Sequence, residues 1–116
     1  MRLAIIGSRT FDNYELLCQE IDKLKVFYQI DIIISGGARG ADSLGMRYAQ
    51  EHKIPFIAFT ADWEKYGKIA GMIRNQDIID TSDYIIAFWD GVSRGTRDSI
   101  RRANKCKKKY KVIYFQ

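Results

Sequence analysis

The sequence predicts an α/β protein: a Rossmann-like, three-layer domain whose five-stranded parallel sheet carries helices on both faces. Five short apolar runs alternate with segments of helical periodicity. The runs are almost continuously apolar, as expected for strands that are buried on both faces. Turns that contain glycine follow the first, second and fourth runs, which is typical of strand-to-helix connections in doubly wound sheets. With right-handed crossovers, we expect the strand order 3-2-1-4-5.

Length and composition indicate one folded domain over residues 1–116, with 47% apolar and 28% charged residues. The apolar run Leu3–Ile6 is too short for a signal peptide or a membrane span, so we expect a cytoplasmic protein without membrane contact. Cys18 and Cys106 are far apart and have no partner motif, and His52 is the one histidine. We therefore predict no disulfide, no metal site and no cofactor.

The first half of the chain supplies two strands and two helices. A strand is expected over Arg2–Ile6, and a helix begins near Asn13 because Asp12 and Glu15 have capping-box spacing. The apolar stripe of that helix consists of Leu17, Ile21, Leu24 and Tyr28. The second strand covers Ile30–Ile34, and the helix after it has Ala41, Leu44, Gly45, Tyr48 and Ala49 on one face. Gly45 on this buried face predicts close packing against the sheet.

The second half of the chain supplies the remaining elements. Pro55 opens a strand over Phe56–Phe59, because proline is tolerated at the first position of a strand. A loop over Thr60–Gly67 and a helix over about Lys68–Asp80 follow, then strands over Tyr84–Phe88 and Val112–Phe115 with a helix between them. The residues expected to face inward on the Lys68–Asp80 helix are Ile69, Met72, Ile73 and Ile79.

The turn Ser35–Asp42 (SGGARGAD) joins a buried strand to a helix and has the composition of an anion site. Free backbone N–H groups at a helix N-terminus, together with the helix dipole, favour phosphate. Gly36, Gly37 and Gly40 allow close approach of the backbone to a ligand, and Arg39 adds a fork of donors. A tight turn that needs glycine only for its geometry is the alternative.

The strand order places the binding crevice between the first and fourth strands, at their carboxyl ends. Several loops meet there, and three of them hold an arginine beside glycine and a small hydroxyl residue. The candidate ligand-binding residues are Gly7, Ser8, Arg9, Gly36, Gly37, Ala38, Arg39, Gly40, Asp42, Asp62, Trp63, Arg74, Asn75, Trp89, Asp90, Gly91, Ser93, Arg94, Gly95 and Thr96. Two glycine turns and converging arginines suit a nucleotide-like ligand that carries phosphate.

Particular roles follow from the chemistry of these side chains. Trp63, Tyr66 and Trp89 could stack on a base, and Asp42, Asp62 and Asp90 could accept hydrogen bonds from ribose hydroxyls or base amines. Each residue taken alone also has a structural explanation, such as an aspartate that complements a helix dipole. The constellation as a whole favours a ligand.

Three familiar catalytic or nucleotide motifs are absent. A P-loop needs lysine and a hydroxyl residue after its last glycine, whereas Ala41 and Asp42 follow Gly40. The first strand ends in Gly7-Ser8-Arg9 without the further glycines of a dinucleotide fingerprint. The one histidine lies far from the predicted crevice, so a nucleophile triad is not supported.

The net charge of +5 invites a nucleic-acid interpretation. Much of the excess comes from Arg101, Arg102, Lys105, Lys107, Lys108, Lys109 and Lys111. A solvated face with cations near a helix C-terminus is the explanation we favour over a nucleic-acid patch.

The motifs GSR, SGGARGAD, ADW with KYGKIAG and RN, and FWDGVSRGT occur in an order that resembles the small YspA-type members of the SLOG superfamily. The resemblance spans nearly the whole chain. It implies a Rossmann-like fold, a nucleotide-derived ligand and a homo-oligomer, to which exposed aromatic residues and small size also point. Many such proteins occur in phages and mobile elements, where sensing or sequestering NAD- or nucleotide-derived signals is a suspected role.

The superfamily also contains LOG-type phosphoribohydrolases and the DNA-processing protein DprA. In the LOG motif a catalytic glutamate follows the Gly-Thr pair; here Gly95 and Thr96 match that pair, Arg74 matches the LOG arginine, and Ser99 occupies the glutamate position. Asp98 is one residue away, which turns it by roughly 100° on a helix. Loss of this carboxylate disfavours N-glycosidic cleavage.

Three hypotheses follow. The first, which we prefer, is a binding protein for a nucleotide or NAD-derived molecule, acting as a sensor or a sponge. The second is a LOG-type phosphoribohydrolase, with Arg74 and Asp90 as the candidate catalytic residues. The third is a DprA-like binder of single-stranded nucleic acid that uses Lys107-Lys108-Lys109.

Overall fold

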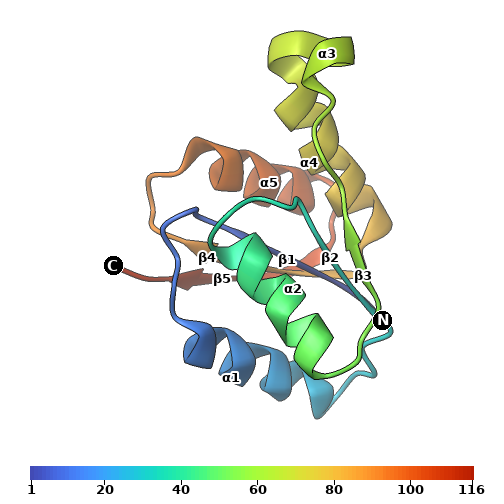
Figure 1. Cartoon of the computed structure of the whole chain (residues 1–116), viewed down its shortest axis with the longest axis vertical. Helices are drawn as coiled ribbons and strands as arrows, with labels where there is room; N and C mark the ends of the chain where they lie inside the picture. Colours follow the sequence, from blue (N-terminus) through green and yellow to red (C-terminus); the bar gives the residue numbers. More distant parts are fainter.

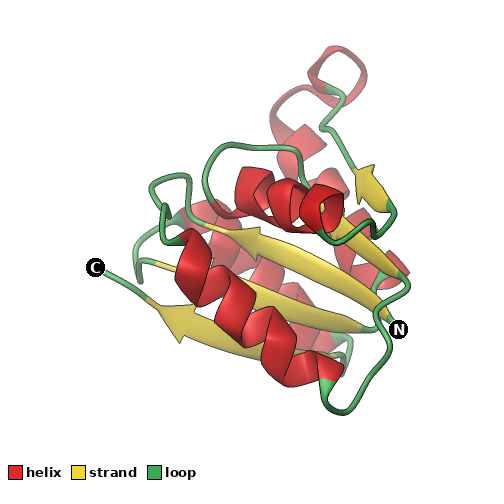
Figure 2. Cartoon of the chain, turned by 60° about the horizontal axis from the view of Figure 1, so that its bottom comes forward, coloured by secondary structure: helices red, strands yellow, loops and turns green.

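The computed structural model describes residues 1–116, and its strands alternate with helices along the chain. The elements are β1 (Arg2–Gly7), α1 (Tyr14–Lys25), β2 (Ile32–Ser35), α2 (Ala41–Glu51), β3 (Phe56–Ala58), α3 (Trp63–Tyr66), the 3₁₀ helix η1 (Gly67–Ile69), α4 (Ala70–Thr81), β4 (Tyr84–Trp89), α5 (Arg94–Lys105) and β5 (Lys109–Tyr114). The five strands are parallel and lie in the order β3-β2-β1-β4-β5 (Figures 1 and 2). The predicted fold class and strand order are confirmed.

The central strands β1, β2 and β4 are buried on both faces, to which their successive side chains point in turn, whereas the edge strands β3 and β5 are half-buried or exposed. Leu3 and Ile5 of β1 pack in a cluster with residues of α1 and α2. Ala4 and Ile6, the alternate residues of the same strand, pack in a second cluster with residues of α4 and α5. Figure 1 shows α1 and α2 separated from α5 by the strands. This two-sided burial explains why the central strands read as continuous apolar runs.

Local signals in the sequence explain how the helices near the site begin and pack. The side chain of Asn13 accepts a hydrogen bond from the N–H of Leu16 at 3.0 Å, so α1 begins at Tyr14, close to the predicted start, but Asn13 caps it and not Asp12. A Cβ atom at Gly45 would lie 3.0 Å from Cβ of Ile5. The backbone of α2 therefore lies directly on β1, as the sequence predicts.

The segment after β3 differs from the prediction. The loop expected over Thr60–Gly67 contains α3, because the Asp62 carboxylate accepts a hydrogen bond from the N–H of Lys65 and caps this short helix. Figure 1 shows α3 projecting beyond the sheet. Ile69 and Met72, expected to face inward, are 53% and 49% exposed, because this end of the helical segment extends beyond the core.

Strand ends also shift by a few residues. β5 begins at Lys109 rather than Val112, because Lys109 pairs in register with Tyr84. β2 begins at Ile32 and ends at Ser35. None of the helices combines the length and the apolar character needed to cross a lipid bilayer.

Candidate functional site

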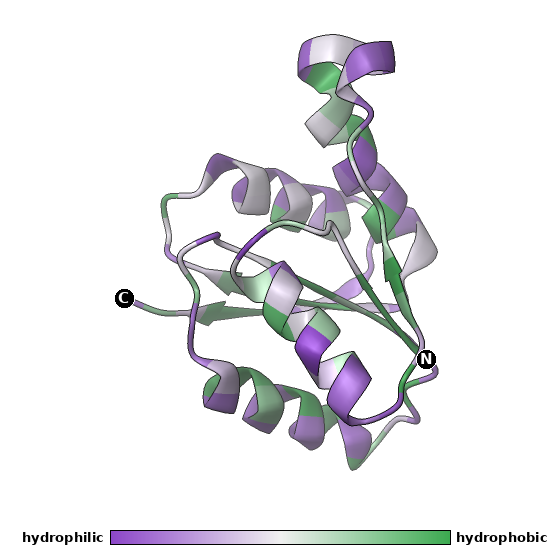
Figure 3. Ribbon diagram, in the orientation of Figure 1, coloured by the Kyte–Doolittle hydropathy of each residue, from purple (hydrophilic) through white to green (hydrophobic).

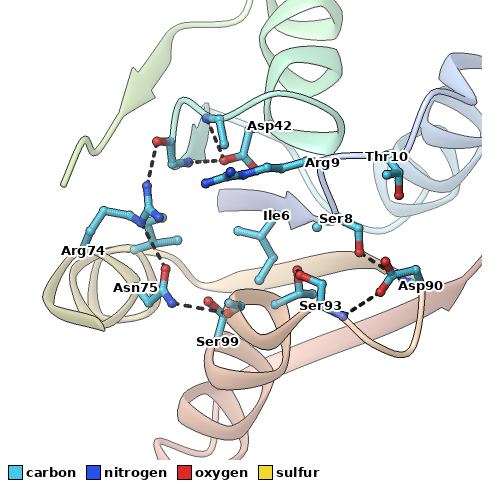
Figure 4. Close-up of a pocket in the computed structure, with 16 residues that line it drawn as sticks. Ile6, Ser8, Arg9, Thr10, Asp42, Arg74, Asn75, Asp90, Ser93 and Ser99 are labelled. Carbon is cyan, nitrogen blue, oxygen red and sulfur yellow. Dashed lines mark hydrogen bonds between the residues drawn. The ribbon is translucent and has the colours of Figure 1, made fainter. Parts of the chain in front are cut away.

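A polar cavity of about 340 Å³ lies at the carboxyl ends of β1, β2 and β4, where the strand order reverses (Figure 4). We call it the central cavity. Its lining residues are Ile6, Gly7, Ser8, Arg9, Thr10, Gly36, Ala38, Asp42, Arg74, Asn75, Ile78, Asp90, Ser93, Gly95, Thr96 and Ser99. This is the place that the predicted topology assigns to a ligand.

Three backbone donors of the β2–α2 turn bind acceptors within the turn itself. The N–H groups of Gly36 and Ala38 both donate to Oδ2 of Asp42, each at 3.1 Å. The N–H of Gly37 donates to the Ser35 hydroxyl at 3.3 Å. These are the groups that the sequence suggested as a phosphate cradle, and the Asp42 carboxylate already occupies the position that an anion would take. These three donors are therefore occupied by groups of the protein.

Asp42 is 6% exposed, and burial raises the pKa of its carboxyl to about 6. Hydrogen bonds from Ala38 and Gly36 and the positive charges of Arg74 and Arg9 act in the opposite direction, toward the carboxylate. Loss of hydration outweighs these contributions. The backbone N–H groups that donate to Asp42 belong to the turn itself, so this side chain stabilises the turn.

Arg74 links α4 to this turn. Its Nη1 donates to the carbonyl oxygen of Gly36 at 2.9 Å, and its Nε donates to Oδ1 of Asn75 at 3.1 Å. In Figure 4, Arg9 reaches from the end of β1 toward the same side of the cavity as Arg74. The central cavity thus has two guanidinium groups on the side formed by β2 and α4.

The β4–α5 turn leaves backbone donors open. Oδ1 of Asp90 accepts hydrogen bonds from the N–H groups of Val92 and Ser93 at 2.9 and 2.8 Å, which lowers the pKa of Asp90. The Ser93 side chain makes no capping bond to α5. The first backbone bond into this helix comes from the N–H of Arg97, so the three N–H groups of residues 94–96 have no partner in the protein.

Hydroxyl groups surround these open donors. The Ser93 and Thr96 hydroxyl oxygens lie 3.3 Å apart, and the Ser8 hydroxyl accepts a hydrogen bond from the N–H of Asp90 at 3.1 Å. Gly95 and Thr96 line the cavity together with Ser99. The start of α5 therefore presents unpaired N–H groups, of the kind that helix N-termini offer to anions, beside a polar cavity.

The carboxylate nearest to the LOG glutamate position is turned away. Asp98 does not line the cavity; its Oδ2 accepts from Nδ2 of Asn75 at 3.1 Å and pairs with Nε of Arg102 at 2.8 Å. Ser99 does line the cavity and is 4% exposed. The two aspartates of the lining, Asp42 and Asp90, both accept hydrogen bonds from backbone N–H groups.

Of the predicted ligand-binding residues, the structure places the following outside the cavity lining: Gly37, Arg39, Gly40, Asp62, Trp63, Trp89, Gly91 and Arg94. Asp62 caps α3, and Trp63 is 59% exposed on that projecting helix. The indole N–H of Trp89 donates to the carbonyl oxygen of Ser93 at 3.0 Å. No aromatic side chain lines the cavity, so the stacking roles suggested for Trp63, Tyr66 and Trp89 have no counterpart there.

Four lining residues were not among the predicted set: Ile6, Thr10, Ile78 and Ser99. Helical spacing could have found Ser99, which follows Thr96 by almost one turn. Thr10 directly follows Arg9. Ile6 and Ile78 read as core residues, and nothing in their type distinguishes a cavity wall from the core.

Comparison with known proteins gives two matches. The model of the YspA, cpYpsA-related SLOG family matches residues 1–66. The Gene 61 protein of Mycobacterium phage D29 is 34% identical over 114 residues, an alignment that covers 90% of this chain and 89% of that protein. No solved structure matches significantly.

Proposed function

We propose that the chain, which belongs to the YspA, cpYpsA-related SLOG family, binds a phosphorylated, nucleotide-derived small molecule in the central cavity. Membership of this family suggests a nucleotide-related role. One observation carries the proposal: the N–H groups of residues 94–96 have no protein partner, and two of these residues, Gly95 and Thr96, line this cavity. Phosphate is the common ligand of such a helix start. Arg9 and Arg74 on the opposite wall supply the positive charge.

The size and chemistry of the cavity restrict the ligand. Its volume of about 340 Å³ is near the lower end of small-molecule sites. Its wall offers hydroxyl, amide and guanidinium groups but no aromatic ring. These features suit the phosphate and the ribose of a ligand, with the base directed toward solvent. We therefore expect affinity to depend on the phosphoribosyl part more than on the base.

Binding without cleavage is the form of the proposal that the carboxylates support. N-glycosidic cleavage needs a carboxylate free to stabilise an oxocarbenium-like state. Asp42 and Asp90 are engaged by backbone donors, and Asp98 is held by Asn75 and Arg102. A protein that holds its ligand unchanged would serve as a sensor or a sponge of a signalling nucleotide. The cytoplasmic location and the homo-oligomer remain predictions.

The test uses isothermal titration calorimetry with AMP, ADP-ribose, NAD and ribose 5-phosphate, and two variants at one position. Arg94→Ala removes a side chain that does not line the cavity. Arg94→Pro removes the same side chain and also the N–H group, at the first helical position, where proline is well tolerated. We expect Arg94→Ala to bind like the wild type and Arg94→Pro to bind about tenfold more weakly, as for loss of one charge-assisted hydrogen bond.

Equal thermal stability of the two variants is the control, and chromatography of the titrated mixtures detects any released base. Equal affinities of Arg94→Pro and Arg94→Ala would place the phosphate away from the N–H group of residue 94. Absence of binding by every compound of the panel would refute the proposal, and release of free base would replace it with the hydrolase hypothesis.

A further inference from the structure

The positive charge of the chain is concentrated at its C-terminal end. Residues 94–116 contain nine Arg and Lys residues and one Asp, which gives a net charge of +8. Because the whole chain has a net charge of +5, the first 93 residues carry −3. A surface formed by α5 and β5 is therefore strongly basic on a body that is slightly acidic.

Four of these cations form a stripe along α5. Arg94, Arg97, Arg101 and Lys105 are all exposed, and none of them forms a salt bridge in the structure. At roughly 100° per residue they fall within an arc of about 80°, opposite the buried side of the helix. The stripe is about 16 Å long, from a rise of 1.5 Å per residue. Figure 3 shows hydrophilic residues along α5.

Helix stability does not explain the stripe. Arg94 and Arg97 lie in the first turn of α5, which contains no acidic residue, and cations at a helix N-terminus oppose the helix dipole. Other cations of the region have structural partners. Lys108 Nζ donates to the carbonyl oxygen of Ser82 at 2.8 Å, and Lys111 pairs with Glu20 at 2.8 Å. The four residues of the stripe are thus available to an external anion.

Aromatic rings adjoin the stripe at its N-terminal half. The guanidinium carbon of Arg97 lies 5.7 Å from the ring centre of Trp89, and the rings of Trp89 and Tyr114 are 5.6 Å apart. Tyr114 ends β5 at the edge of the sheet and is 66% exposed. A cation, a half-buried indole and an open phenol ring therefore form one continuous surface.

We propose that this α5–β5 surface binds single-stranded nucleic acid, with phosphates along Arg94, Arg97, Arg101 and Lys105 and a base stacked on Tyr114. Positive charge that follows a backbone, with aromatic rings for unpaired bases, is the combination that single-stranded binding uses. A duplex would find phosphate contacts but would leave Tyr114 without a base, and an acidic polypeptide would leave it unused as well. This surface lies outside the central cavity, and the inference does not depend on the function proposed for that cavity.

The test measures fluorescence anisotropy of labelled oligo-dT of about 20 nucleotides, longer than the roughly 4–16 nucleotides of known single-strand sites. Arg97→Glu combined with Arg101→Glu should weaken binding more than about tenfold and reduce the slope of log K against log salt. The matched control combines Lys53→Glu with Lys68→Glu, which changes the net charge equally at two cations that form no salt bridge. We expect the control to bind within about twofold of the wild type, because it leaves the phosphate contacts intact.

Stacking has its own readout. Tyr114→Ala should weaken oligo-dT binding roughly fivefold or more, whereas Tyr114→Phe should retain it. Thermal melting shows that each variant is folded. The proposal is overturned by any of these results: no binding of oligo-dT, equal losses in the two charge-reversal pairs, equal binding by Tyr114→Ala and Tyr114→Phe, or competition by polyglutamate as effective as by unlabelled oligo-dT. Displacement of the oligonucleotide by AMP would also overturn it, by locating the nucleic acid in the central cavity.

Discussion

The two turns beside the central cavity have similar compositions, but the protein occupies different backbone donors in each. Each joins a buried strand to a helix, contains a glycine with positive φ and uses an aspartate to bind backbone N–H groups. In the β2–α2 turn the aspartate is Asp42, which is buried and accepts hydrogen bonds from the N–H groups of Gly36 and Ala38. In the β4–α5 turn the aspartate is Asp90, which binds Val92 and Ser93 and leaves the start of α5 open.

The difference shows that a glycine-rich turn before a helix is not in itself a phosphate site. The number of donors that remain after the protein has satisfied its own acceptors decides the matter. In the β2–α2 turn the N–H groups of Gly36, Gly37 and Ala38 are occupied within the turn, whereas in the β4–α5 turn the N–H groups of Gly95 and Thr96, which line the cavity, have no protein partner. The same substitution made in each of the two turns should therefore have very different effects on stability.

The largest difference is expected for alanine at the two positive-φ glycines, Gly40 and Gly91, with φ of +78° and +84°. A Cβ at Gly40 would meet the carbonyl oxygen of Ser8 and would lie 2.7 Å from Cα of Arg9, whereas nothing lies within 4 Å of a Cβ at Gly91. We expect Gly40→Ala to lower the free energy of unfolding by more than about 4 kcal/mol, and Gly91→Ala by about 1 kcal/mol from backbone strain alone.

Urea denaturation followed by circular dichroism measures both values. Because the two glycines share the left-handed region of φ, the comparison separates steric exclusion from backbone preference. Similar losses in the two variants would show that the β2–α2 turn can move away from Ser8 and Arg9, and that the close approach of these two loops is not essential.

A smaller effect on the free energy of unfolding is expected for substitution of Asp42, the acceptor in the β2–α2 turn. Asp42→Ala leaves the N–H groups of Gly36 and Ala38 without a partner, whereas Asp42→Asn retains an oxygen that can accept from both. We expect the alanine variant to be less stable than the asparagine variant by about 2–4 kcal/mol. In the β4–α5 turn, Asp90→Ala and Asp90→Asn should differ less in stability, because water can replace the exposed carboxylate there. Equal stability of the two Asp42 variants would contradict this role for the acceptor.

The sequence was sufficient for the fold because strand burial and helix spacing are local patterns. Apolar runs such as Leu3–Ile6 and the helical spacing of Ala41, Gly45 and Tyr48 specify the layers, and right-handed crossovers between parallel strands then favour the observed strand order. The helix at Trp63–Tyr66 was missed because it is four residues long and depends on one capping carboxylate, Asp62.

The location of the central cavity could also be predicted, since it follows from where parallel strands end. Which backbone N–H groups already have an acceptor within the protein could not be predicted. Asp42 in the first turn of a helix is compatible with a dipole interaction, a ligand contact or an internal acceptor, and only the path of the loop distinguishes them. Trp89 directly follows Phe88 in the strand, but the direction of its indole toward Ser93 depends on the turn that follows.

The pH dependence of stability distinguishes the two aspartates by sign. Burial raises the pKa of Asp42 from its ordinary value near 4 to about 6, so the folded protein binds a proton here more tightly than the unfolded chain does. Stability gained from this proton is present at low pH and is lost as pH rises from about 4 to about 6. The Asp42→Asn variant has no titratable group at this position, so it does not undergo this loss of stability. Its free energy of unfolding, relative to that of the wild type, should therefore rise by on the order of 2 kcal/mol across that window and stay level above it.

For Asp90 the N–H groups of Ser93 and Val92 lower the pKa, and the sign is reversed. The stabilising contribution of its carboxylate is present above the ordinary carboxyl pKa and is lost on acidification, so Asp90→Asn should fall behind the wild type as pH rises through that range. Urea denaturation at half-unit intervals from about pH 3 to pH 8 measures both differences, and all other carboxyl groups cancel within each pair. Curves of the same sign for the two positions would mean that Asp42 is hydrated rather than enclosed, and the β2–α2 turn would then be as open to a ligand as the start of α5.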